Sequence, residues 1–178
     1  MTTSLEAAYP PFRASLLSGG FATPDDGGWS AELVAAQVAL NNHHIAEAAE
    51  AVVRGEEVTY DNEASVDDAE LSRYADRLGG LVGLAEEIRR SAAHLDHAYK
   101  ALGDHAEKCI HVRIRDGEAI AYDGPMSIGQ FVLGNVTRHV ELHHEQLKAV
   151  HAPGSVSRQT SSNPTNSSSS VEPRTHCS

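Results

Sequence analysis

The sequence predicts an all-α protein, an antiparallel four-helix bundle with one short β-hairpin between the third and fourth helices. Three observations support this fold class: long stretches carry apolar residues at helical spacing, one alternating segment precedes the last of them, and the connections contain Gly, Pro and Asp. Short connections join such helices as antiparallel neighbours. At 178 residues the chain is long enough for one domain with a substantial core.

The first two helices are predicted at residues 3–17 and 30–54. Two consecutive prolines at positions 10 and 11 break or restart the first helix, which therefore has the weaker pattern. A loop with two glycine pairs separates it from the second helix. The second helix begins at Ser30 and carries a clear apolar stripe.

The third helix is predicted over residues 66–102, with a weak point at Gly79-Gly80. Apolar residues at 110, 112 and 114 then alternate with polar ones, and Asp116-Gly117 follows. This dipeptide tolerates the positive φ angles of a type I′ turn, so the segment predicts a β-hairpin.

The last helix is predicted from Pro125 to Val150, with Ser127 and Gln130 at the spacing of a capping box. The folded domain is then expected to cover residues 1–151. Residues 152–178 are dominated by Ser, Thr, Asn and Pro, which predicts a disordered tail. Such a composition suits either a linker toward another domain or a frayed extension.

Charge and hydropathy argue against two classes of partner. A net charge of −11 does not suit a phosphate backbone, which needs clustered Lys and Arg. The chain has no run of about eighteen apolar residues and no pattern of a signal peptide at its start. Two cysteines cannot build a disulfide framework and fit a reducing compartment. We therefore expect a cytoplasmic protein with a small-molecule substrate, with no nucleic-acid or membrane partner.

His139 and His143 are the main candidates for a metal site. At about 100° per residue, both fall in the middle of the apolar stripe of the last predicted helix. Two buried imidazoles one turn apart aim free nitrogens at one point, where a divalent metal would satisfy both. Gln37 and His44 lie on the apolar face of the second helix, and His44 is the first choice for a third ligand.

Other interpretations of the histidines remain open. A histidine on an apolar face is commonly a core residue bonded to a neighbour, and the HxxxH spacing arises by chance in a His-rich chain. A ferritin-like di-iron site would need the Glu-x-x-His motif on two core faces, and Glu141 with His144 supplies one copy. The remaining histidines outside the second helix are expected at the surface: His94, His97, His105, His111, His151 and His176.

Two stretches resemble the DinB and mycothiol-dependent maleylpyruvate isomerase superfamily. They are Gly-Trp-Ser-Ala-Glu-Leu-Val-Ala-Ala-Gln at 28–37 and Arg-His-Val-Glu-Leu-His-His at 138–144, and the likeness covers about residues 10–150. In that superfamily a four-helix bundle holds one divalent metal, usually zinc or nickel. The ligands are a His on the second helix and HxxxH or ExxxH on the fourth. The resemblance implies His139 and His143 as the fourth-helix ligands.

One position departs from the family pattern. The superfamily has its second-helix His about eight residues after the Trp, where this chain has Gln37. Either His44 replaces it or the site is altered, and Gln37, Asn41 and Glu141 are then candidates for an additional or supporting role. The resemblance implies a transferase or isomerase in which the metal activates a low-molecular-weight thiol such as mycothiol or bacillithiol. The alternative is a non-enzymatic helical module that binds metal or forms a homodimer.

Overall fold

The computed structural model describes residues 4–24, 27–117 and 119–151. The predicted tail at 152–178 lies outside these residues. The helices are α1 (Pro10–Ser18), α2 (Ala31–Val53), α3 (Asp68–Leu78), α4 (Leu81–Leu102), α5 (Ile128–Gly134) and α6 (Val140–Val150). The strands are β1 (Thr59–Asp61), β2 (Cys109–Asp116) and β3 (Ala119–Ser127).

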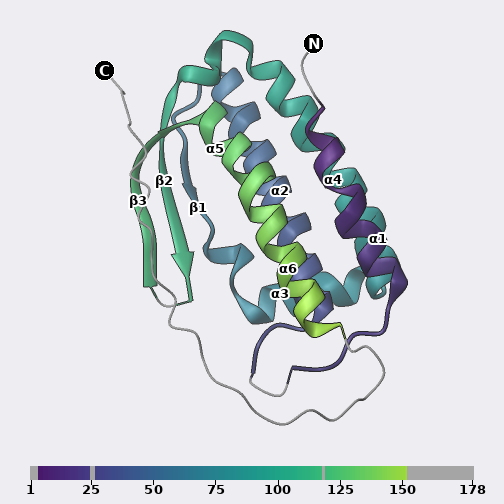
Figure 1. Cartoon of the computed structure of the whole chain (residues 1–178). Helices are drawn as coiled ribbons and strands as arrows, with labels where there is room; N and C mark the ends of the chain where they lie inside the picture. Colours follow the sequence, from purple (N-terminus) through teal and green to yellow (C-terminus); the bar gives the residue numbers. More distant parts are fainter. Residues whose placement is uncertain (1–3, 25–26, 118, 152–178) are drawn as a thin grey trace.

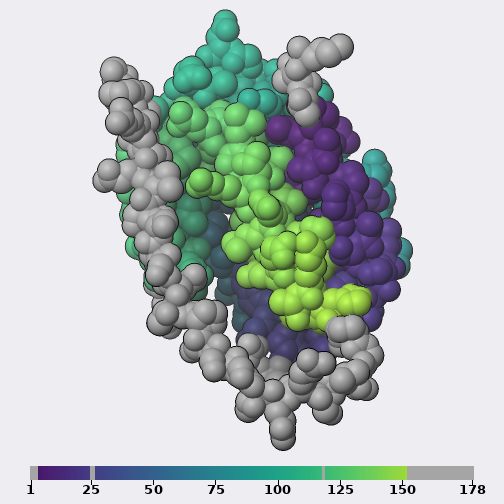
Figure 2. Space-filling model, viewed as in Figure 1, coloured from purple at the N-terminus to yellow at the C-terminus, as the bar shows by residue number. Residues whose placement is uncertain are grey.

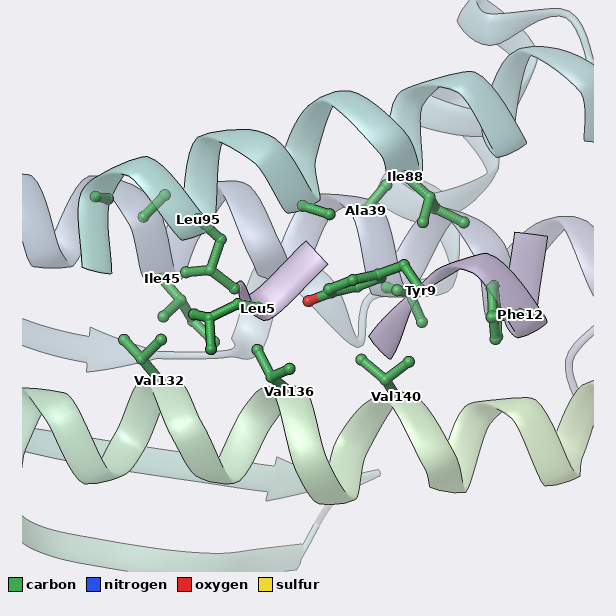
Figure 3. Packing of buried hydrophobic residues seen from close by; sticks show 14 of the residues in the cluster. Leu5, Tyr9, Phe12, Ala39, Ile45, Ile88, Leu95, Val132, Val136 and Val140 are labelled. Carbon is green, nitrogen blue, oxygen red and sulfur yellow. The ribbon is translucent and has the colours of Figure 1, made fainter. Parts of the chain in front are cut away.

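The core lies where α1, α2, α4 and the segment from α5 to α6 meet. Figure 1 shows that this last segment runs along α2, with α1 and α4 on one side of it and the three strands on the other. Tyr9 and Phe12, at the start of α1, point between α4 and the valines of the α5–α6 segment (Figure 3). No helix in the described part of the chain combines the length and apolarity needed to cross a membrane.

The prediction of an all-α four-helix bundle with a single hairpin is wrong. The protein is mostly helical, but it contains a three-stranded mixed sheet in the order β1-β2-β3, with β1 parallel and β3 antiparallel to β2. Strand β1 has three residues, too few for an alternating pattern to be recognised. It is held by its pairing with β2 and by buried Tyr60, whose ring packs on Phe131 with centroids 4.6 Å apart.

The single helix predicted over residues 66–102 is two helices, α3 and α4. Gly79 and Gly80 have φ angles of 75° and 88°, in the left-handed region that favours glycine. This backbone ends α3 and lets the chain restart as α4 in a new direction. The predicted weak point is therefore a complete break.

The hairpin is present and is longer than predicted. Asp116 at the end of β2 pairs with Ala119, so the turn begins at Gly117, which has a φ of 58°, and not at Asp116. Pro125 lies within β3, and α5 begins three residues later. The predicted cap is confirmed, because the Ser127 side chain accepts a hydrogen bond from the backbone N–H of Gln130 at 3.4 Å.

Candidate functional site

A π-helical stretch, Asn135–His139, joins α5 to α6 and positions the two histidines of the candidate site. Such stretches are rare within α-helices, and those that occur are often found at functional sites. His139 ends the stretch, and His143 follows one α-helical turn later. Their Nε2 atoms lie 2.9 Å apart, with the rings nearly perpendicular at 82°. The structure thus brings together the two residues that the spacing singles out.

Both imidazoles are held in their neutral form. Burial, with a smaller contribution from the neighbouring His143, lowers the pKa of His139 to about 3. Burial also lowers the pKa of His143, whose exposed fraction is 4%, against an opposing contribution from its hydrogen bond with Gln146. Neutral imidazoles are the form that coordinates metal ions.

The hydrogen bonds around the pair leave two lone pairs facing each other. Gln146 Oε1, which can only accept, lies 2.6 Å from His143 Nδ1, so this nitrogen carries the proton. Gln37 Nε2, which can only donate, lies 3.0 Å from His139 Nε2, so that nitrogen carries none. With the two amides in this orientation, the Nε2 atoms meet as acceptors at 2.9 Å, and a cation between them would relieve this contact.

Two further polar atoms of the site are buried without a hydrogen-bond partner among the described residues: Gln37 Oε1 and His139 Nδ1. An unpaired buried polar atom costs about 1–3 kcal/mol, so such atoms are uncommon unless a ligand or an ion uses them. If an ion lay between the two Nε2 atoms, a half-turn of the Gln37 amide would direct its oxygen, in place of its nitrogen, toward that ion. The set of two imidazoles and one amide oxygen fits the donor preferences of a divalent transition metal.

The structure does not bring His44 to this pair. Gln37 faces His139 and Asn41 faces Asn135, so α2 runs antiparallel to the facing segment. His44 lies seven residues beyond Gln37, which is about 10 Å further along the helix axis. Burial lowers the pKa of His44. The charged groups that act on His44 include Glu70 of α3, but neither His139 nor His143. Gln37, and not His44, is the side chain of this pair that reaches His139.

Asn41 supports the site indirectly and does not contact the two histidines. Its amide donates to Asn135 Oδ1 at 2.6 Å, and its oxygen accepts from the Tyr60 hydroxyl. Asn135 in turn donates to Asn42 Oδ1 at 3.2 Å. These buried amides fix the first turn of the π-helical stretch that ends at His139.

Glu141 points away from the imidazole pair. It is exposed and lies with His144 in a shallow surface groove against Ala8 and Pro11. His144 itself contacts Ser15 Oγ of α1 at 2.9 Å. Neither residue takes part in the candidate site.

Two contributors were not predicted from the sequence, Trp29 and Gln146. The Trp29 ring stacks on His143 with centroids 6.5 Å apart and an interplanar angle of 16°, while its Nε1 donates to Asp68 at 2.8 Å. Gln146 follows His143 by three residues, a spacing at which helical side chains meet. That spacing was the available signal for Gln146. For Trp29 the only signal was its place in the stretch 28–37.

The candidate centre therefore consists of two imidazoles and an amide. Within the described ranges, no group of three or more His, Cys, Asp or Glu side chains is arranged to hold a metal ion. Figure 2 shows the surface hollowed between the α5–α6 segment and the strands. No protein-family model, no curated protein and no solved structure matches the chain.

Proposed function

We propose that the protein binds a divalent transition metal, zinc or nickel, at His139 and His143 and acts as a thiol-dependent transferase or isomerase on a small electrophile. The observation that supports this most directly is the approach of two Nε2 lone pairs to 2.9 Å. At metal–nitrogen distances of about 2.0–2.1 Å, nitrogens at the right angles of octahedral coordination lie about 2.9 Å apart, whereas the tetrahedral geometry typical of zinc would need about 3.3–3.4 Å. The proposal also agrees with the resemblance of residues 28–37 and 138–144 to the thiol-dependent superfamily.

The neighbouring side chains suit this role. The bond from His143 Nδ1 to Gln146 orients the imidazole so that Nε2 faces the site, as partners of metal-bound histidines commonly do. Stacked Trp29 shields His143 from water on one face. Gln37 contributes either its oxygen as a ligand or its N–H as a donor to a bound anion.

A bound divalent ion would supply the positive charge that lowers the pKa of a coordinated thiol and makes a nucleophile available at neutral pH. Two imidazoles and one amide leave coordination positions free for that thiol, as catalytic sites do and closed structural sites do not. Neutral His139 and His143 keep their lone pairs available for the ion.

Zinc titration of metal-free protein, followed by the ring resonances of individual histidines, tests the metal site. We expect the resonances of His139 and His143 to shift together, and His143→Ala to weaken the response of His139 at least about tenfold. His97→Ala, at an exposed position on α4, is the matched control and leaves both responses unchanged. Unshifted rings at saturating zinc and nickel would contradict the proposal.

The thiol role needs its own measurement. Cobalt-loaded protein is expected to develop thiolate-to-metal absorption on addition of a small thiol, and to accelerate transfer of that thiol to a chromogenic electrophile. The low exposure of His143 favours one rival, a non-enzymatic helical module with a structural metal. Metal binding without any thiol response would support that rival.

A further inference from the structure

A second histidine pair lies between α2 and α4, on a different face of α2 from Gln37. His43 Nδ1 lies 3.3 Å from His94 Nδ1, with ring centroids 5.6 Å apart. The two side chains are 27% and 31% exposed, so an ion from solvent can reach them. The sequence predicts a surface position for His94, and the structure pairs this residue with His43 of a neighbouring helix.

Each imidazole of this pair is anchored by a carboxylate. His43 Nε2 lies 2.8 Å from Glu87 Oε1, and His94 Nε2 lies 2.8 Å from Glu50 Oε1. An ionised carboxylate can only accept, so both Nε2 atoms carry a proton. In the neutral rings both Nδ1 atoms then present lone pairs to each other at 3.3 Å. A cation between them would remove this repulsion.

We propose that His43 and His94 form a second binding site for a divalent transition metal such as zinc, coordinated by the two Nδ1 atoms. The 3.3 Å separation matches the value of about 3.3–3.4 Å for two ligands in tetrahedral positions at about 2.0–2.1 Å from the ion. Both rings already have the carboxylate–histidine arrangement that typically orients metal ligands and raises their basicity.

Charge also favours a divalent ion at this place. With neutral rings, the ionised carboxylates of Glu50 and Glu87 give the cluster two negative charges, which one divalent ion would balance. Arg90 balances little of this charge, because its guanidinium is 3.8 Å from the other oxygen of Glu87 and 63% exposed. The site is independent of the proposed thiol chemistry, because it uses other residues on other faces.

A metal ion at this site would hold neighbouring helices together. It would bridge α2 to α4 directly, and α3 is linked to the same cluster because the Tyr74 hydroxyl donates to Glu87 at 3.2 Å. Two protein ligands leave the remaining positions to water, which fits a surface clamp between helices more than a closed structural centre.

The test is a zinc titration of the His139→Ala/His143→Ala double variant, which lacks the first site. We expect one remaining equivalent of zinc, a shift of the His43 and His94 ring resonances, and a higher Tm with zinc. Adding His94→Ala to this variant should abolish all three effects, whereas adding His97→Ala should leave them. Glu87→Gln should weaken binding about 10–100-fold.

A pair that holds only a shared proton would overturn the proposal. In that case saturating zinc shifts neither ring and binds with no more affinity than in the variant that also carries His94→Ala. If the double variant does not fold, the same ring resonances are followed in the wild-type chain. There, the responses of His43 and His94 are read separately from those of His139 and His143.

Discussion

The two histidine pairs of this protein share one problem and differ in their surroundings. In both, two imidazole lone pairs face each other, at 2.9 Å for His139 with His143 and at 3.3 Å for His43 with His94. The first pair sits within one helical segment, deep in the protein, with amides as neighbours. The second joins two helices near the surface, with carboxylates as neighbours.

This difference predicts different kinds of site. At the inner pair an ion meets neutral dipoles in a desolvated environment, where electrostatic effects on a bound ligand are strong. At the outer pair it meets two negative charges that are partly screened by water. The inner pair is therefore suited to chemistry on a bound ligand, and the outer pair to holding helices together.

The largest expected effect is the acid sensitivity that the inner pair imposes. The pKa of His139 in the folded protein is about 3, below its ordinary value of 6.5, so between these pH values the unfolded chain binds more protons. The free energy of unfolding therefore falls as the pH drops through this window, by about 3 kcal/mol between about pH 7 and pH 4 from His139 alone. Urea denaturation of metal-free protein at several pH values measures this loss.

His139→Gln removes the titrating group. It should therefore reduce the loss of unfolding free energy between about pH 7 and pH 4 by about the amount assigned to His139. His143, whose pKa burial also lowers, contributes in the same direction and remains in this variant. His97→Gln, at an exposed position, should leave the slope unchanged. An equal slope in wild type and His139→Gln would show that His139 is not the acid-sensitive group.

The next effect is a gain of metal affinity at the inner pair. Gln37→His places a third imidazole at the position that contacts His139, so we expect zinc to bind at least about tenfold more tightly, equivalent to about 1.4 kcal/mol. Gln37→Ala is the control, since it removes the amide without adding a strong ligand. Calorimetric titration in the His94→Ala background keeps the outer pair out of the measurement. An affinity no higher than that of the unsubstituted background would mean that position 37 does not reach the ion.

The contrast between the pairs also explains what the sequence could predict. His139 and His143 share one helix, so periodicity alone brings them together. The same periodicity gives only the direction of a side chain relative to the apolar face of its own helix. It therefore predicts a surface position for His94, whose partner is on another helix. Pairing across helices depends on the register between them, which no local pattern contains.

The apolar pattern of α2 could not decide between Gln37 and His44 for a related reason. Seven residues make nearly two helical turns, so both side chains leave α2 in almost the same direction. Their height along the axis differs, and height is fixed by the contacts of Gln37 with His139 and Asn41 with Asn135. The three-residue strand β1 was missed because it depends on a distant partner, β2.

The smallest expected effect tests whether the outer pair is stabilising without metal. His94 and Glu50 are 31% and 37% exposed, so a double-mutant cycle with His94→Ala and Glu50→Gln should give a coupling below about 1 kcal/mol in metal-free protein. Saturating zinc should raise this coupling, because Glu50 then orients a ring that carries a ligand atom. The exposed pair Arg73 with Glu70 on α3 serves as the control cycle, and zinc should leave its coupling unchanged. If zinc changes neither coupling, the carboxylates hold the rings in place but do not support a metal, and the contrast between the two pairs reduces to one of burial.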